Sequence, residues 1–372
     1  MSAVWALLAA FFLAALQAAL FAIFNLHALS YRRYLNKKTV YEGEKVELVE
    51  VIRNMKILPV PWLRAESRIS PFLRFGRQHS AEREISAEQY HKSVFFLAPF
   101  RQVTRRHTIS CLHRGCYDIG SVALTTGDIF GMSNRTTQTK HDCTLEVWPR
   151  LLSENELTTP CTRWQGEMAV RRYILPDPFL VANIRGYMQG DPLRDIHWRA
   201  TARTGSLQVK VRDYTADPKV LVLLNVQTKE NQWGELMDYE QETIEQGIRI
   251  AATLCERALR YGSEAGFASN ACYQGEKGTG QTIFVPARRS ADQLEQLFSA
   301  MSRMIIHYEA TFQTFLDNFE VSGADILILS AYESEGIRRR MREMELLGNS
   351  VAFMPLENLE AAPGQAKGGA SA

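Results

Sequence analysis

The pattern of apolar and polar residues divides the chain into three main regions, beginning with an apolar stretch. Residues 4–24 are almost wholly apolar, and Gln17 is their one polar interruption. A helix rises roughly 1.5 Å per residue, so this run is long enough to cross a hydrocarbon core of about 30 Å. Residues 1–30 are therefore predicted to form a transmembrane helix. A buried core helix is the alternative interpretation.

Basic residues follow the apolar stretch closely, and none precedes it. They are Arg32, Arg33, Lys37 and Lys38. A cleavable signal peptide would carry a basic segment before its apolar run, so the pattern disfavours one. The positive-inside rule predicts a single-pass protein of the cell membrane, with its N-terminus outside and its soluble domains in the cytoplasm.

Residues 31–150 show the short alternating segments of a β-rich domain. Glu42-Gly43-Glu44 predicts a turn. Apolar-rich segments predict strands over residues 46–52, 94–97 and 104–112. Three prolines are expected to confine their part of the chain to edges and loops: Pro59, Pro61 and Pro71. Several short strands between turns predict a small β-sandwich-like domain, for which a binding module is the natural role.

Residues 207–358 alternate between strand and helix patterns. Strands are predicted over residues 207–212, 220–224, 266–268, 282–285, 325–330 and 351–355. Helices are predicted over residues 238–261, 290–301, 311–319 and 333–347. Asp238 is the expected N-cap, with Gln241 closing a capping box, and residues 276–280 are the expected tip of a hairpin. This alternation predicts a doubly wound α/β domain with a parallel sheet.

Two further segments complete the predicted α+β multidomain organisation. Residues 151–206 form a linker that contains an unusually charged stretch, and residues 359–372 are a Gly- and Ala-rich tail that is expected to be disordered. Composition narrows the function only a little. A hydrophobic content of 46% and a charged content of 23% exclude wholesale disorder, and a net charge of +2 gives no field that favours nucleic acid. Six cysteines in 372 residues indicate reduced thiols rather than a disulfide scaffold.

Four side chains of zinc-ligand type lie within ten residues of one another in the β-rich domain. They are His107, Cys111, His113 and Cys116. His107, Cys111 and His113 would share one face of a strand, but a single strand seldom surrounds a tetrahedral ion. Ile109 on the same face indicates that this face is partly core. No metal is predicted here.

The stretch from Arg185 to Arg203 is the most unusual part of the chain. Gly190-Asp191-Pro192 predicts a tight turn. Four following residues are expected to be buried: Leu193, Ile196, Trp198 and Ala200. Four others are expected to face polar partners: Arg194, Asp195, His197 and Arg199. Two interpretations remain open, namely a salt-bridged turn and strand that support a neighbouring sheet, or a recognition surface. Catalysis is disfavoured because no nucleophile is paired here with a base and an orienting group.

The order of residues in this stretch resembles the signature of the domain of unknown function 58 family. The matching positions are Arg185, Tyr187, Gly190, Asp191, Arg194, Ile196, Trp198, Thr201, Ala202 and Arg203. Upstream positions that also resemble the family are Arg114-Gly115, Tyr117, Ile119-Gly120, Asp128, Phe130-Gly131 and Trp148-Pro149-Arg150. The resemblance implies a von Willebrand factor type A-like domain over residues 207–358. It also implies a companion AAA+ ATPase of the MoxR type and a role in assembly or maturation of envelope complexes.

Type A domains bind a metal on a D-x-S-x-S loop after the first buried strand, and this chain departs from that pattern. The corresponding loop here runs from Asn225 to Lys229 and offers an amide and a lysine in place of the carboxylate and serines. Hard cations need oxygen ligands with compensating negative charge. We therefore expect no metal and no cofactor at this loop.

The sequence leaves two functions of different classes. The first is a non-enzymatic, membrane-anchored scaffold or adaptor that binds protein partners. In that case five side chains orient the domains or form the docking face: Arg185, Asp191, Arg194, Trp198 and Arg203. The alternative is a hydrolase-like membrane enzyme with a site around Asp191 or Asp195, His197 and Thr201. The scaffold is the favoured prediction, because arginine cannot act as a base. No small-molecule substrate is indicated.

Overall fold

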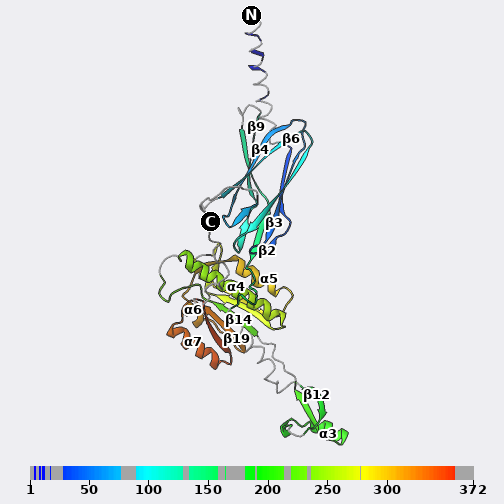
Figure 1. The fold of residues 1–372 in the computed structure, drawn as a ribbon, viewed down its shortest axis with the longest axis vertical. Coiled ribbons are helices and arrows are strands. Elements are labelled where there is room, and N and C mark those ends of the chain that lie inside the picture. Colours follow the sequence, from blue (N-terminus) through cyan, green and yellow to red (C-terminus); the bar gives the residue numbers. More distant parts are fainter. Residues whose placement is uncertain are drawn as a thin grey trace, which may run out of the picture. The chain divides into compact units, whose positions relative to one another are not determined.

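The computed structural model describes residues 4–5, 8–9, 11–12, 17, 28–76, 89–128, 134–157, 164, 181–188, 191–212, 219–232, 236–276 and 278–356. The chain divides into two compact units, residues 1–150 and residues 151–372. Figure 1 shows strands throughout both units and helices in the second. The predicted mixture of α and β structure is thus confirmed.

Most of the predicted transmembrane helix lies outside the described residues. Within the part of the chain that the structure describes, no helix has the length and apolar character needed to cross a membrane. The helix over residues 1–30 stays a prediction. By Leu29 the chain has already entered a strand, β1 (Leu29–Leu35).

The first unit is built from strands. After β1 these are β2 (Thr39–Tyr41), β3 (Lys45–Asn54), β4 (Val60–Ile69), β5 (Leu73–Phe75), β6 (Gln89–Leu97), β7 (Gln102–Cys111), β8 (Gly115–Asp118), β9 (Ser121–Gly127), β10 (Asn134–Lys140) and β11 (Thr144–Trp148). They form two four-stranded sheets, in the orders β1-β3-β7-β5 and β10-β9-β4-β6, and a three-stranded sheet in the order β2-β11-β8. The strands predicted over residues 46–52, 94–97 and 104–112 are confirmed as parts of β3, β6 and β7.

The two four-stranded sheets share an interior with two apolar clusters and a polar layer between them. On β3, Leu48 belongs to one cluster and Ile52 to the other, with the buried Glu50 between them. Strands β1 and β4 repeat this pattern with Arg33 and Ser67 at the central position. Side chains in a strand alternate between faces, so all of these residues point into the same interior. We refer to Arg33, Glu50, Ser67, His91, Ser93 and His107 as the polar layer.

Pro61 lies in a strand rather than in a loop. It is the second residue of β4, ahead of Leu63, where the pairing with β9 begins. The register between β4 and β6 shifts between Val60 and Leu63, so the chain bulges where Pro61 has no N–H to donate. A bulge at the end of a paired strand therefore accommodates this proline.

The second unit combines strands and helices. Its strands are β12 (Val181–Gly186), β13 (Gln208–Arg212), β14 (Lys219–Leu224), β15 (Glu264–Ser269), β16 (Ala271–Tyr273), β17 (Ile283–Arg288), β18 (Met304–Tyr308), β19 (Ala324–Ser330) and β20 (Ser350–Pro355). Its helices are η1 (Leu193–Asp195), a 3-10 turn, and α3 (Trp198–Thr204), α4 (Asp238–Arg260), α5 (Gln293–Arg303), α6 (Phe312–Asp317) and α7 (Glu335–Leu346). Five strands form one sheet in the order β17-β15-β14-β19-β20.

Helices cover both faces of the five-stranded sheet. Leu221 and Leu223 of β14 belong to the cluster that contains the apolar side chains of α6 and α7. Leu224 points to the opposite face, where it approaches Gly247 of α4. Strands β15, β14, β19 and β20 are parallel as predicted, but β17 runs antiparallel to β15.

Two local predictions in this unit need correction. The N-cap of α4 is Met237, not Asp238, and the Glu240 carboxylate rather than Gln241 accepts the hydrogen bond from the Met237 N–H, at 3.0 Å. Strand β17 does run antiparallel to β15, as the predicted hairpin requires. Strand β16, which lies between β15 and residues 276–280 in the chain, pairs with β18 instead and is not part of that hairpin.

Gly266 of β15 is a site where the sheet tolerates no side chain. A Cβ there would lie 2.6 Å from the Ala287 backbone nitrogen and 2.8 Å from both a Leu221 methyl carbon and the Val285 carbonyl oxygen. We predict that Gly266→Ala lowers the free energy of unfolding by at least about 2 kcal/mol, because overpacking a filled interior is costly. Denaturant unfolding measures this change.

The matched control is Gly186→Ala on β12, where a Cβ has no neighbour within 4 Å. This variant should unfold within about 0.5 kcal/mol of the wild type. Equal stabilities for the two variants would contradict the packing described for β15.

Candidate functional site

Strands β12 and β13 pair antiparallel, and η1 and α3 lie between them in the chain. We refer to the described residues 181–188 and 191–212 as the signature unit. Ile196 is its buried centre and forms an isolated bridge with Val209 of β13, which is also buried. One of the two interpretations of the sequence was a turn and strand over this stretch, but a 3-10 turn and a short helix form instead. The unit is small, so few of its apolar side chains find cover.

Arg185 and Asp191 hold the turn of the signature unit together. The two guanidinium Nη atoms each donate to one carboxylate oxygen at 2.7 Å, and the Met188 N–H donates to the same carboxylate at 2.8 Å. These hydrogen bonds, chiefly the one from Arg185, lower the pKa of Asp191, and the same pair raises the pKa of Arg185. The pair thus gives Arg185 and Asp191 a local structural role. Gly190 lies outside the described residues.

Helix α3 is capped at both ends by residues of the signature unit. His197 is the N-cap, and its Nδ1 accepts a hydrogen bond from the Ala200 N–H at 3.0 Å. The Thr201 hydroxyl accepts from the Gln208 N–H at 3.0 Å, which ties the helix to β13. Gly205 ends the helix in the left-handed region, at φ 71°. His197 and Thr201 therefore have local structural contacts.

Several apolar side chains of the signature unit are exposed, and two of them, Leu193 and Trp198, were predicted to be buried. Leu193 is 69% exposed and Trp198 is 68% exposed, and Met188 is exposed to a similar extent. Ile196 is buried as predicted. Among the other signature residues, Arg194 and Arg203 are exposed, while Tyr187 is half-buried and its N–H donates to the Leu207 carbonyl. The unit thus presents aromatic, aliphatic and basic side chains on its surface.

The edge of the five-stranded sheet where a type A domain would hold its metal is closed by neutral amides. Asn225 is buried, its Nδ2 donates to Ser330 Oγ at 2.9 Å, and its Oδ1 accepts from the Gln227 N–H. Asn270 accepts from the Val226 N–H at 3.0 Å. Lys229 pairs with Glu240 at 3.4 Å. These contacts satisfy the polar groups of the edge with one another, and the expectation that it holds no metal stays a prediction.

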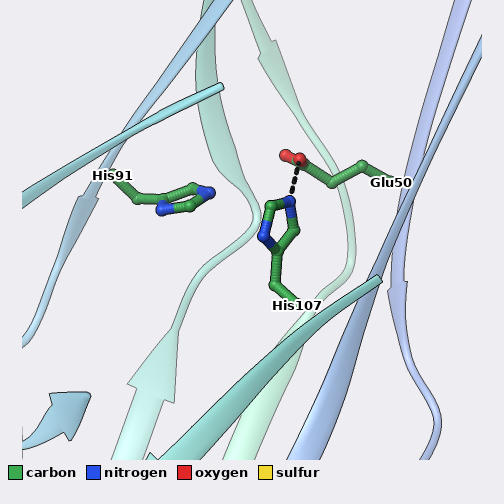
Figure 2. Close-up of side chains that lie close together, drawn as sticks. All are labelled: Glu50, His91 and His107. Atoms are coloured by element: carbon green, nitrogen blue, oxygen red, sulfur yellow. Dashed lines mark hydrogen bonds and ion pairs between the residues drawn. The ribbon is translucent and has the colours of Figure 1, made fainter. Parts of the chain in front are cut away.

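The polar layer of the first unit contains a second candidate site, which Figure 2 shows. Glu50 is 1% exposed and lies on β3, His107 lies on β7, and His91 lies on β6 of the facing sheet. His107 Nε2 donates to Glu50 Oε2 at 3.0 Å, because an ionised carboxylate can only accept. Tyr31 donates to the other carboxylate oxygen at 2.7 Å, and Arg33 Nε lies 4.0 Å from that oxygen.

These contacts set the protonation of the layer. Burial by itself would raise the pKa of Glu50, but the hydrogen bonds from His107 and Tyr31, together with the charge of Arg33, outweigh it and lower the pKa to about 2. Burial and the neighbouring His107 lower the pKa of His91 to about 4. Burial also raises the pKa of Tyr31 well above its usual value. At neutral pH the layer holds an ionised Glu50 and a neutral His91.

A cavity of about 820 Å³ opens beside the two histidines. Both rings line it, together with three basic side chains, Lys92, Arg105 and Arg106. The Arg105 guanidinium lies over the Phe95 ring, 4.2 Å from its centre. Water or a small anion can therefore approach the imidazole rings from a basic surface.

Two side chains of zinc-ligand type that lie near His107 in the sequence do not join it in the structure. Cys111 is buried in an apolar cluster, and the His113 ring contacts Phe72 instead of the other ligand types. The partners of His107 come from strands far apart in the chain, so residue spacing within one strand gave no sign of them. Arg33, which the sequence placed among the basic residues that flank a membrane helix, is in fact buried beside Glu50.

Comparison with known proteins extends the family resemblance to a defined part of the chain. Residues 183–312 match the family described as "Protein of unknown function DUF58". A Bacillus subtilis (strain 168) protein described as "Uncharacterized protein YeaD" is 21% identical over 265 residues, which cover 71% of this chain and 62% of that protein. The chain thus spans less than two thirds of the length of this relative.

Solved structures resemble the chain only weakly. A Salmonella alpha-2-macroglobulin mutant has a TM-score of 0.22 and 17% identity, over 34% of this chain and 7% of that one. The sporulation control protein Spo0M from Bacillus subtilis has a TM-score of 0.19 and 12% identity, over 44% of this chain and 58% of that one. Scores this low support no inference about function.

The Arg185–Asp191 pair should be visible as a depressed carboxyl pKa. In the wild type, carboxyl carbon shifts should report a pKa of Asp191 below the ordinary value of about 3.9, and Arg185→Gln should raise it. The stabilisation that depends on ionised Asp191 is present above the unfolded pKa and is lost as the pH falls through the folded one. An Asp191 pKa that does not change on substitution of Arg185 would show that the pair does not form in solution.

Glu50 should be essential to the stability of the first unit. Glu50→Gln leaves the buried Arg33 without its counter-charge, and we predict a loss of about 3 kcal/mol or more in the free energy of unfolding. The measurement is denaturant unfolding at pH 7 with a chelator present. Glu47→Gln is the control, since its side chain is 44% exposed and its carboxylate lies 4.0 Å from Arg106, whose side chain is 72% exposed. If both variants lose the same small amount, the charge of Glu50 does not stabilise the layer.

Proposed function

We propose that this chain is a non-enzymatic scaffold that binds a protein partner through its signature unit. The observation that carries the proposal is the exposure of Trp198, Leu193 and Met188 on a unit whose internal contacts are already made. Tryptophan and arginine are enriched among the residues that dominate binding energies at protein interfaces. An aromatic and aliphatic surface of this kind gains stability when a partner covers it.

The partner that fits this surface carries an apolar groove bordered by acidic side chains. Residues 181–212 contain six basic side chains and two acidic ones, and one acidic side chain, Asp191, is held by Arg185. Complementary charge would orient the partner and speed its association. We propose a MoxR-type AAA+ ATPase in this role, with assembly or maturation of envelope complexes as the setting. The support is the family resemblance of the signature and the match over residues 183–312.

Two further parts of the proposal concern architecture. The five-stranded sheet with helices on both faces fits a von Willebrand factor type A-like domain whose metal edge has been replaced by amides. The apolar run over residues 4–24 supports a single membrane anchor with the N-terminus outside and the soluble units in the cytoplasm.

The enzyme alternative, with Asp191, His197 and Thr201 as its site, gains no support from the geometry. Asp191 is held by Arg185, His197 caps α3, and Thr201 accepts from the Gln208 N–H. A nucleophile needs a base within hydrogen-bond reach, and each of these three groups is instead engaged in a local contact.

Site-specific crosslinking in cells tests the docking surface. A photocrosslinking amino acid in place of Trp198 should capture the AAA+ ATPase, and the same amino acid in place of Tyr239 should not. Tyr239 is the matched control, because it is 63% exposed on α4, away from the signature unit in the sequence.

With the purified ATPase, Trp198→Ala should weaken binding by about 30-fold, as expected for a residue that dominates an interface, and Tyr239→Ala should leave it unchanged. Equal crosslinking at both positions, or unchanged affinity of Trp198→Ala, would rule out the signature unit as the docking surface.

A further inference from the structure

The polar layer of the first unit has the composition and spacing of a transition-metal site. One ligand atom from each of Glu50, His91 and His107 lies within 4.8 Å of the other two, as the converging side chains in Figure 2 show. In a tetrahedral zinc site with bonds near 2.0–2.1 Å, ligand atoms are about 3.4 Å apart. To reach that spacing, no pair of these atoms would need to approach by more than about 1.4 Å. We propose that Glu50, His91 and His107 bind one divalent transition-metal ion of the zinc class.

The two oxygens of the Glu50 carboxylate have different roles in the proposed site: one is held by neighbouring side chains and the other would bind the ion. Oε1 accepts from the Tyr31 hydroxyl at 2.7 Å and faces Arg33, so this oxygen is fixed from β1. Oε2 faces only the imidazole of His107 among the contacts described for it. An entering ion would bind Oε2 and the His107 nitrogen in place of the hydrogen bond that now joins them. Supporting hydrogen bonds of this kind are a regular feature of metal-binding carboxylates.

His91 has a nitrogen available for an ion. Its Nε2 lies 3.0 Å from Ser93 Oγ, while its Nδ1 is buried and has no hydrogen-bond partner among the described residues. In Figure 2 the His91 nitrogen turned toward Glu50 and His107 is Nε2, the one farther from the backbone. When Nδ1 carries the proton, the lone pair of Nε2 accepts a hydrogen bond from the Ser93 hydroxyl, and an entering ion would bind this lone pair in place of that hydrogen bond.

The donor set selects the class of ion. Two imidazoles and one carboxylate suit zinc and similar transition metals, whereas calcium and magnesium require oxygen ligands. Three protein ligands leave a fourth position open, and the cavity of about 820 Å³ that both histidines line gives water or a small anion access to it. The positive charge of Arg33 and the basic cavity wall favour an anionic fourth ligand, such as hydroxide, over a neutral one.

Titration of the full chain, after treatment with a chelator, with Co²⁺ and then Zn²⁺ tests the site. Wild-type protein should bind one equivalent of Co²⁺ with visible d–d absorption that Zn²⁺ abolishes. His91→Gln and His107→Gln should each weaken binding at least tenfold. Tyr31→Phe removes only the support of Oε1, and it should weaken binding by about tenfold to 100-fold. His113→Gln is the control, since this histidine contacts Phe72 outside the layer, and it should bind like the wild type.

Wild-type protein that takes up no Co²⁺ and no Zn²⁺ at micromolar concentrations overturns the proposal, whatever the variants do. Binding that His91→Gln and His107→Gln both retain overturns it as well, because the ion then lies elsewhere. Circular dichroism of each variant separates loss of the site from loss of the fold. If a glutamine variant does not fold, Zn²⁺ should raise the midpoint of thermal unfolding in the wild type and in His113→Gln, and the absence of that rise counts against the site.

Discussion

The interior of the first unit depends on one buried charge, the carboxylate of Glu50. An ionised group removed from water is costly unless it is paired and hydrogen-bonded, and Glu50 meets that condition through Tyr31 and Arg33 on β1 and His107 on β7. Three adjacent strands of one sheet are therefore joined through side chains as well as through their backbones. His91 approaches from the facing sheet, so the same charge also organises the contact between the sheets.

The same principle governs the signature unit on a smaller scale. The Asp191 carboxylate takes two hydrogen bonds from Arg185 and one from the Met188 N–H, and this fixes a turn that has little apolar interior to support it. Because the ion pair and the buried Ile196 hold the unit, Trp198 and Leu193 are not needed inside it. In a unit that is stabilised by polar contacts, large apolar side chains can stay exposed and remain able to contact another molecule.

The sequence predicted the features that depend on patterns within one segment, and it missed those that depend on contacts between segments far apart in the chain. Helices α4, α6 and α7 and strands β3, β6 and β7 follow from periodic apolar positions, and they lie where the sequence placed them. Strand β1 was missed because Arg33 resembles a flanking charge until Glu50 is brought opposite it. His91 and Glu50 could not be assigned to one site, since they meet only across the two facing sheets. Trp198 was expected to be buried because it is apolar. Apolar character alone does not show that a short segment has too small a core to bury it.

The polar layer also bears on how the chain avoids competing arrangements of its strands. Arg33 stands opposite Glu50 in the pairing of β1 with β3. A slip of β1 by two residues would keep the same side chains pointing inward, but it would place the guanidinium opposite Leu48 or Ile52. In each shifted register the two opposite charges would be buried apart from each other among apolar side chains. Such a register would be less stable than the observed one by several kcal/mol. The buried ion pair thus specifies the register of β1 against β3, which purely apolar side chains would not do.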